Sequence, residues 1–331
     1  MIAKDIFMSP GVGTTTMVCV LAISAVSCGD PAAIADCASD PNCDLFGPGS
    51  PLVGAGPDDG ERRYVQVSAG DDFTCAVDDG GEIVCFGRDD WNVVSGSPSR
   101  RGDWSGTSAR RFQEVSANGA SACALDTEGE IFCWGINHDL MSYPPAGPHR
   151  AISASSTFSC VIDDDGALAC WGYGPDNIFS DIPEGRFHTL AVSANNGCVI
   201  DDDDVLHCWG ALLGSGRPEG RVLDVAAESL GDFCAVLVGG ALACWGEENE
   251  LRNHPPPDGL FTHVGVAGDS ACALDQDGVA HCWGPEYSET LVPPADAFVD
   301  LSVAYSHACG LTADGEIVCW GRNDEGQLDV P

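Results

Sequence analysis

The chain has 331 residues and carries 51 aspartates and glutamates against 14 lysines and arginines, which gives a formal net charge of −37. Such an excess of negative charge excludes functions that depend on contact with a nucleic-acid backbone or an anionic membrane surface. The 18 cysteines are typical of a protein that folds in an oxidising compartment.

Residues 1–27 predict a secretory signal peptide. Residues 17–27 form an apolar run, preceded by the only lysine, Lys4. The run is too short to span a bilayer as a mature helix but fits the hydrophobic region of a leader. The small residues before Cys28 resemble the cleavage box of a bacterial lipoprotein, which predicts a lipid on this cysteine. Ordinary signal cleavage nearby, without a lipid, is the alternative.

Residues 28–62 are rich in glycine, proline, alanine and aspartate, so we expect a flexible tether between the membrane and the rest of the chain. If Cys19 leaves with the leader and Cys28 carries the lipid, 16 of the 18 cysteines remain. Fourteen of these form the repeated pairs described next. Cys37 and Cys43 are then left to form a small disulfide loop within the tether.

Residues 63–331 contain one unit copied seven times. Each copy has two cysteines ten positions apart, and the first cysteines of successive copies are separated by 48, 37, 38, 36, 38 and 37 residues. A period of this length indicates a repeat architecture. Short alternating apolar runs between glycine, aspartate and proline predict strands and turns, so the fold class is all-β. The predicted disulfides are Cys75–Cys85, Cys123–Cys133, Cys160–Cys170, Cys198–Cys208, Cys234–Cys244, Cys272–Cys282 and Cys309–Cys319.

The ten-residue spacing also predicts the hairpin between the paired cysteines. Directly opposed cysteines at an even spacing need an odd-numbered loop, and a three-residue loop places glycine at its third position in six copies and Asp204 in the other. A three-residue hairpin needs a left-handed backbone there, which glycine adopts without strain. We therefore expect each pair at a non-hydrogen-bonded position, where Cα atoms come within about 4.5 Å and a disulfide can close.

Metal binding is the alternative interpretation of the cysteines and of the aspartate-rich loops. Zinc needs closely spaced cysteine clusters, and only pairs at ten recur. Calcium needs a spaced Asp-x-Asp-x-Asp-Gly…Glu ligand set, which no loop has. We therefore predict no metal and no cofactor. We expect the loop aspartates to form turns and to gather as an acidic ring at one end of the domain.

After the second cysteine, six copies continue with Trp-Gly and the first with Phe86-Gly87. Neighbouring strand residues face opposite sides of a sheet, so both sides need cover, and we expect each aromatic ring to pack between neighbouring sheets. The last copy, SHACGLTADGEIVCWGRNDEGQLDVP (306–331), resembles the regulator-of-chromosome-condensation repeat over nearly its whole length. The other six copies match it through the stretch around the two cysteines.

This resemblance implies a seven-bladed β-propeller over residues 63–331, like the bacterial secreted members with short Cys-paired units, among them propeller-type β-lactamase inhibitors. The loops used by eukaryotic nucleotide-exchange and nucleosome-binding members have no counterpart here, so no functional residue carries over. We expect residues 327–330 to form a strand that completes a blade with residues 64–68. Such closure would remove exposed sheet edges.

The first copy is about ten residues longer than the others, and the excess lies in residues 88–111. This segment holds five of the thirteen arginines and the only two tryptophans outside the Cys-Trp-Gly positions. Both residue types are enriched at binding hot spots, and loops on rigid scaffolds often carry recognition. A surface insertion whose arginines pair with the acidic body is the alternative. The candidate binding residues are Trp91, Trp104, Arg88, Arg100, Arg101, Arg110 and Arg111.

No motif for phosphate binding, metalloprotease or serine-hydrolase chemistry occurs, so no catalytic residue is predicted. We predict a monomeric, secreted, lipid-anchored propeller that binds a protein partner at the bacterial cell envelope, in the periplasm or at the outer membrane. It would touch the membrane only through its anchor and would not bind nucleic acid. The alternatives are an inhibitor of a secreted enzyme and an envelope polysaccharide hydrolase that uses carboxylates in the central channel.

Overall fold

The computed structural model describes residues 18–22, 25–29, 62–98, 110–136, 144–173, 178–210, 216–227, 231–246, 250–285, 288 and 292–331. The chain separates into two compact units, Met1–Glu61 and Arg62–Pro331. In the first unit, β1 (Val18–Ala22) pairs with β2 (Ala25–Gly29) in the antiparallel sense. The predicted leader and tether therefore stay predictions. The side chains that carry the predicted lipid and the predicted tether disulfide, Cys28, Cys37 and Cys43, lie outside the described part.

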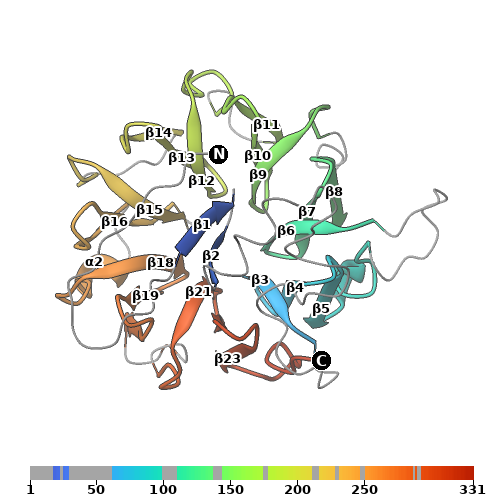
Figure 1. Ribbon diagram of the computed structural model, residues 1–331. Helices are drawn as coiled ribbons and strands as arrows, with labels where there is room; N and C mark the ends of the chain where they lie inside the picture. The colour runs from blue at the N-terminus through green and yellow to red at the C-terminus, as the bar shows by residue number, and fades with distance from the viewer. Residues whose placement is uncertain are drawn as a thin grey trace. The chain divides into compact units, whose positions relative to one another are not determined.

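The unit Arg62–Pro331 consists of seven three-stranded antiparallel sheets arranged in a ring (Figure 1). The three strands of each sheet follow one another in the chain, so each sheet is one repeat. The predicted all-β, seven-bladed propeller is confirmed. From the first blade to the seventh, the strands are β3 (Tyr64–Ala69), β4 (Phe73–Asp78) and β5 (Ile83–Gly87); β6 (Phe112–Asn118), β7 (Ser121–Asp126) and β8 (Ile131–Gly135); β9 (His149–Ala154), β10 (Phe158–Asp163) and β11 (Leu168–Gly172); β12 (Phe187–Val192), β13 (Asn196–Asp201) and β14 (Leu206–Gly210); β15 (Val222–Ala227), β16 (Phe233–Leu237) and β17 (Leu242–Trp245); β18 (Phe261–Ala267), β19 (Ser270–Asp275) and β20 (Ala280–Trp283); β21 (Phe298–Val303), β22 (His307–Thr312) and β23 (Ile317–Gly321).

The second and third strands of each blade are joined by the predicted three-residue loop. In the first blade, the Asp78 N–H closes the loop by donating to the Glu82 carbonyl at 3.0 Å. The third loop residue has a positive φ in every blade, from 63° at Asp204 to 89° at Gly166. The paired cysteines lie directly opposite each other with Cα atoms 4.0–4.1 Å apart, and all seven predicted disulfides of this unit are present.

The third loop residue also joins each blade to the next. Its carbonyl accepts a hydrogen bond from the first residue of the next inner strand, as between Gly129 and the His149 N–H at 3.1 Å. The equivalent bond from the Tyr64 N–H to the Gly315 carbonyl, at 2.8 Å, connects the seventh blade to the first. A Cβ added at Gly129 would lie 2.6 Å from the His149 nitrogen. Glycine at this position therefore allows both the left-handed turn and the close approach of the next blade.

The predicted closing strand is wrong, because residues 327–330 are turn and coil and β3 pairs only with β4. Each blade already takes three strands from one continuous segment, and at the free edge of β3 the Ala69 N–H is bonded to the Ser302 hydroxyl at 2.9 Å. The C-terminal tail instead packs at the seam, the place where the seventh blade meets the first, and individual hydrogen bonds hold it there. One of them runs from the Tyr64 hydroxyl to the Pro331 carbonyl at 2.8 Å.

The hydrophobic core is divided into seven clusters, one between each pair of neighbouring blades. The tryptophan after the second cysteine is buried in all six copies that have it. Trp283 of the sixth blade, for example, belongs to one cluster with Cys234 and Cys244, the disulfide of the fifth. The predicted packing of the aromatic series between blades is thus confirmed, and the disulfides form part of the same interfaces.

In the described part of the chain, the segments that follow the first, third, fifth and seventh blades each carry a buried side chain onto the next blade, which was not predicted. Val93, after the first blade, clusters with Trp134 of the second, and the Trp134 indole N–H donates to the Val93 carbonyl at 2.6 Å. Ile178 and Leu251 cluster in the same way with the tryptophan of the following blade. Gln327, fully buried, occupies the equivalent place against the first blade. These tails lock successive blades together.

Replacing Gly129 with alanine is expected to lower the free energy of unfolding by about 3 kcal/mol. The φ of 81° strains alanine by about 1–2 kcal/mol, and the added methyl overlaps the backbone of the next blade. Gly119→Ala is the matched control, since Gly119 has a φ of 54° but an added Cβ would meet only the Ser156 Cβ, at 3.6 Å. Urea unfolding of both variants measures the difference, and equal losses would contradict a role in blade contact.

Candidate functional site

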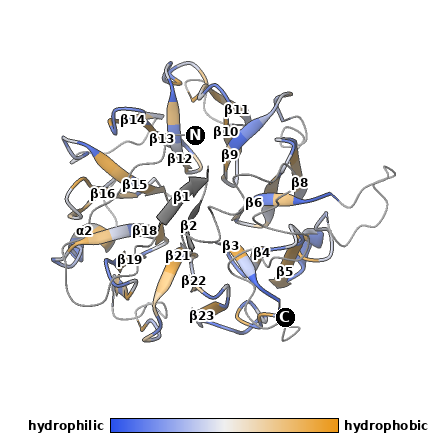
Figure 2. Cartoon of the chain, in the orientation of Figure 1, coloured by the Kyte–Doolittle hydropathy of each residue, from blue (hydrophilic) through white to orange (hydrophobic). Residues whose placement is uncertain are grey.

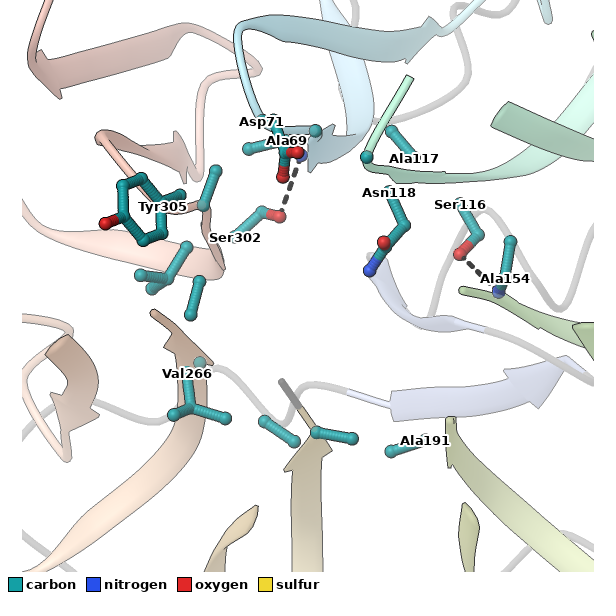
Figure 3. Close-up of a pocket in the computed structure, with 18 of the residues that line it drawn as sticks. Ala69, Asp71, Ser116, Ala117, Asn118, Ala154, Ala191, Val266, Ser302 and Tyr305 are labelled. Carbon is teal, nitrogen blue, oxygen red and sulfur yellow. Dashed lines mark hydrogen bonds between the residues drawn. The ribbon is translucent and has the colours of Figure 1, made fainter. Parts of the chain in front are cut away.

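A cavity of about 640 Å³ opens within the ring of blades, where the inner strands end (Figure 3). All seven inner strands contribute to its wall, and many of the lining side chains are small, such as Ala69, Ala117, Ala154 and Ala191. Small side chains leave the centre of the ring unfilled. We call this end of the propeller the mouth end, and the opposite end, where the three-residue loops lie, the hairpin end.

Serine side chains of the inner strands hold the cavity wall together. The Ser116 hydroxyl accepts the Ala154 N–H of the next blade at 2.9 Å, and the Ser302 hydroxyl accepts the Ala69 N–H across the seam at 2.9 Å (Figure 3). These bonds satisfy N–H groups along the free edges of inner strands, which would otherwise be open to pairing with another chain. The wall is therefore a rigid frame built from neighbouring blades.

Three carboxylates, Glu114, Asp224 and Asp300, lie earlier on the inner strands, toward the hairpin end. Glu114 accepts the Ile152 N–H of the next blade at 3.4 Å, and Asp224 accepts the Val264 N–H at 3.0 Å. Burial raises the pKa of all three, that of Glu114 to about 7. None of the three lines the cavity. Each of the three accepts a backbone N–H, which offsets part of the cost of its burial.

Trp91 lies at the mouth end, in the short helix η1 (Asp90–Asn92) that follows the first blade, and its side chain is 66% exposed. The φ values of Trp91 and Asn92 are 62° and 58°, a left-handed conformation that is uncommon outside glycine. Asp89 holds this turn, because its carboxylate accepts the Val94 N–H at 2.9 Å and the next N–H at 2.8 Å. The turn thus presents the indole to solvent on a constrained backbone.

Arg88 fastens the same turn to the first and the last blade. Its guanidinium lies 3.1 Å from Asp72, 2.8 Å from Asp90 and 3.9 Å from Glu325 in the tail of the last blade. The hydrogen bond to Asp72 and the charges of these neighbours raise the pKa of Arg88 above its ordinary value. Arg88 is therefore a positioning residue for the turn, paired within the chain.

The other predicted binding residues do not converge on this turn. Arg110 lies at the hairpin end, where it contacts Asp126 and Glu130 at 2.6 Å each and covers the Phe132 ring at 4.4 Å. Arg111, beside it, is exposed. The contacts of Arg110 agree with the alternative interpretation, in which the segment is a surface insertion whose arginines pair with the acidic body. Arg100, Arg101 and Trp104 lie outside the described residues.

Two more aromatic side chains at the mouth end were missed. Tyr173 follows the Trp-Gly pair of the third blade, and Tyr305 lies in the loop between β21 and β22; they are 67% and 64% exposed. Tyr305 borders the cavity (Figure 3) and covers Gly268 of the sixth blade, where an added Cβ would lie 2.6 Å from its ring. Most other copies have a small residue at the position of Tyr305, and that departure from the repeat was the available signal.

The aspartates of the hairpin loops form turns, as predicted. The Asp126 carboxylate, for example, accepts the Glu128 N–H at 2.9 Å and the Glu130 N–H at 2.8 Å. Among the described residues, no group of three or more histidines, cysteines, aspartates or glutamates is placed to hold a metal ion. None of the helices in the same part of the chain is long and apolar enough to cross a membrane.

Three parts of the chain match the family model of the Regulator of chromosome condensation (RCC1) repeat: residues 64–90, 112–139 and 298–327. They correspond to the first, second and last blades and the segments that follow them. No curated protein matches the chain significantly in sequence.

Two solved plant receptor ectodomains share the fold. The entire ectodomain of the Physcomitrella patens receptor kinase CR4 superimposes with a TM-score of 0.64 at 21% identity, over 79% of this chain and 74% of that one. The CRINKLY WD40 ectodomain of the Arabidopsis thaliana receptor kinase ACR4 gives a TM-score of 0.61 at 21% identity, over 81% and 99%. At this identity the likeness concerns the fold alone. Three of its seven blades match the RCC1 repeat and all seven sheets form one ring, so the chain is a β-propeller that contains RCC1-type repeats.

Proposed function

We propose that this chain is a rigid protein-binding module whose contacts lie at the mouth end of the propeller. The observation that carries the proposal is Trp91, a large apolar ring exposed on a left-handed backbone. Such a conformation costs on the order of 1–3 kcal/mol and persists only where its surroundings impose it, commonly at binding sites. Tryptophan is also among the residues most enriched at binding hot spots.

The mouth end offers more than one anchor. Through its contact with Glu325, Arg88 connects the turn of Trp91 to the last blade, which also carries Tyr305. Tyr305 in turn borders the cavity. A partner docked on this face would therefore meet two exposed aromatic rings on a scaffold that is cross-linked in every blade, which keeps the entropy lost on binding small.

The proposal includes where the module works. Residues 1–27 would direct secretion, and a lipid on Cys28 would tether a monomeric propeller to the bacterial cell envelope. The seven disulfides support an extracellular or other oxidising setting. The net charge of −37 supports a protein that stays apart from its own copies.

A hydrolase that works in the channel receives less support. Glycoside hydrolysis needs two carboxylates in different environments, one kept protonated and one ionised. Burial raises the pKa of Glu114, Asp224 and Asp300 alike, so no pair with opposite shifts stands out, and none of the three lines the cavity. Inhibition of a secreted enzyme would be one form of the proposed binding and would depend on the same face.

Trp91→Ala is expected to weaken partner capture roughly thirtyfold, the effect of losing a hot spot of about 2 kcal/mol, while the melting temperature stays unchanged because the ring is exposed. The immobilised full chain would capture proteins from envelope extract, with quantitative mass spectrometry comparing the variants. Val292→Ala removes an apolar side chain that is 81% exposed in the connection between β20 and β21, and it is the control. A partner retained equally by wild type and Trp91→Ala would contradict the proposal.

A further inference from the structure

The hairpin of the fifth blade departs from the other six. Its loop, Val238-Gly239-Gly240, contains no carboxylate, whereas every other loop contains at least one. Leu237 stands where five other blades place an aspartate that accepts loop N–H groups. The acidic ring predicted for the hairpin end is therefore interrupted at this blade. The fifth blade thus lacks both the aspartate that accepts the N–H groups of the turn and the negative charge of the loop. A departure at one of seven equivalent positions indicates a local requirement other than folding.

Four large apolar side chains surround this hairpin and face solvent. Val205, Leu223, Val238 and Leu260 are 43%, 48%, 47% and 52% exposed. We call them the blade-five patch. Leu223 is the second residue of β15, an inner strand that is hydrophobic over most of its length (Figure 2). Exposed apolar clusters of this kind, rimmed by polar residues, mark interaction surfaces.

The backbone holds the members of the blade-five patch together. Val205 forms a β-bridge with Arg221, two residues before Leu223, and the Val238 N–H donates to the Arg221 carbonyl at 2.8 Å. Leu260 lies against the loop from the other side, since a Cβ added at Gly240 would be 3.2 Å from its Cβ. The patch therefore spans the fourth, fifth and sixth blades on a fixed frame.

Negative charge flanks the blade-five patch on both sides. Asp202 and Asp203 are exposed in the hairpin of the fourth blade, and Asp277 is exposed in that of the sixth. Arg221, between them, is held toward the fourth blade by the Asp204 carboxylate and the Asp203 carbonyl. Asp202 is paired with Arg186 at 3.2 Å, so Asp203 and Asp277 are the main carboxylates of an acidic rim around the apolar centre.

We propose that the blade-five patch is a second docking surface, and that its occupant is a protein segment that presents apolar side chains flanked by lysine or arginine. The apolar residues of such a segment would cover the four exposed side chains, and its cations would reach the carboxylates on both sides. Charge of this complementary kind accelerates encounter and fixes the orientation of the partner.

The charge pattern disfavours the other occupants. In a symmetric pair of these chains the same patch would meet itself, which would bring the acidic rims together in a protein of net charge −37. An anionic lipid surface would be repelled for the same reason.

This surface is distinct from the proposed mouth-end site. Leu223 lies near the beginning of β15, whereas Ala226 and Ala227, at the end of the same strand, line the mouth-end cavity. The two surfaces therefore lie at opposite ends of the blade.

The test measures the Kd of a short fluorescent peptide for the full chain by fluorescence anisotropy. In this peptide, leucine and lysine alternate. Leu223→Gln and Val238→Asp copy residues found at the same positions in other blades, so both variants are expected to fold with unchanged melting temperatures. Each is expected to raise the Kd of the peptide about tenfold, because one large apolar side chain no longer contributes to the contact. Val299→Gln, at the equivalent exposed position of β21, is the matched control and should leave the Kd unchanged.

Val238→Asp separates apolar from purely electrostatic binding. The added carboxylate strengthens the attraction of lysine, so weaker binding by this variant supports apolar docking. A serine–lysine peptide is expected to bind at least tenfold more weakly than the leucine–lysine peptide. Equal affinity for the two peptides, or an unchanged Kd in both patch variants, would overturn the proposal. A dimer seen by sedimentation and lost in Leu223→Gln would overturn it in favour of a second copy.

Discussion

Reduction of the disulfides is expected to lower the melting temperature of the propeller steeply. For a cross-link that closes about ten residues, the chain-entropy model gives roughly 2.5 kcal/mol. The hairpin is formed without the cross-link as well, so each contribution is smaller than this limit. Seven such contributions are nevertheless large beside a typical folding free energy of about 5–15 kcal/mol. We therefore expect the fully reduced chain to melt far below the oxidised one.

The measurement must allow for burial, because the first cysteine of every pair is fully buried and the native protein will resist reductant. The chain is reduced in denaturant, refolded under reducing conditions and compared with the oxidised protein by calorimetry, with thiols titrated to establish complete reduction. The double variant Cys123→Ala, Cys133→Ala is the matched single-pair test and should lower the melting temperature by about 5 °C or more. An unchanged melting temperature in fully reduced protein would contradict the stabilising role of the disulfides.

Glu114→Gln is expected to stabilise the propeller at pH 8 by about 3 kcal/mol and to have little effect at pH 4. Burial, with a smaller contribution from Asp300, raises the pKa of Glu114 from 4.5 to about 7. A raised pKa means that the folded state prefers the protonated carboxyl. The favourable contribution is therefore complete below pH 4.5 and is lost as the pH rises through 7. Glutamine is neutral at every pH and escapes this loss.

The chain contains its own precedent for this substitution. Gln66 occupies the same place on the inner strand of the first blade, where its side chain accepts the Val115 N–H at 3.0 Å and donates to the Val115 carbonyl at 3.0 Å. Urea unfolding between pH 4 and pH 8 measures the effect. Glu128→Gln removes one charge from an exposed hairpin and is the matched control. Wild type and Glu114→Gln with the same pH profile would contradict the expectation.

The cysteine spacing predicted the hairpins because the constraint is local. Opposed cysteines, a three-residue loop and a left-handed third residue all lie within eleven consecutive positions, as in Cys75–Cys85. The tryptophan series was equally accessible, since alternation along a strand places it on the face opposite the cysteine. The closing strand failed because a match between residues 327–330 and the beginnings of other copies could not reveal that each blade is complete in itself.

The candidate site was predicted only in part. The long first copy led to Trp91, and the structure adds the strained turn that holds it, imposed by Asp89 and Arg88. The same reasoning grouped Arg110 with Trp91, although Arg110 lies at the other end of the propeller. Residues close in sequence separate here because the chain crosses from the mouth end of one blade to the hairpin end of the next.

The sequence by itself determined the repeat count, the hairpin between paired cysteines, the disulfide pairs and the turn chemistry. All of these follow from contacts between residues a few positions apart. Only the tertiary structure decided how blades lock through their tails, where the cavity opens and which departures from the repeat share a surface. Those contacts join residues about one repeat apart or more, such as Val93 with Trp134 at a separation of 41. Local periodicity carries no record of which residues meet across a blade interface, because every copy repeats the same pattern.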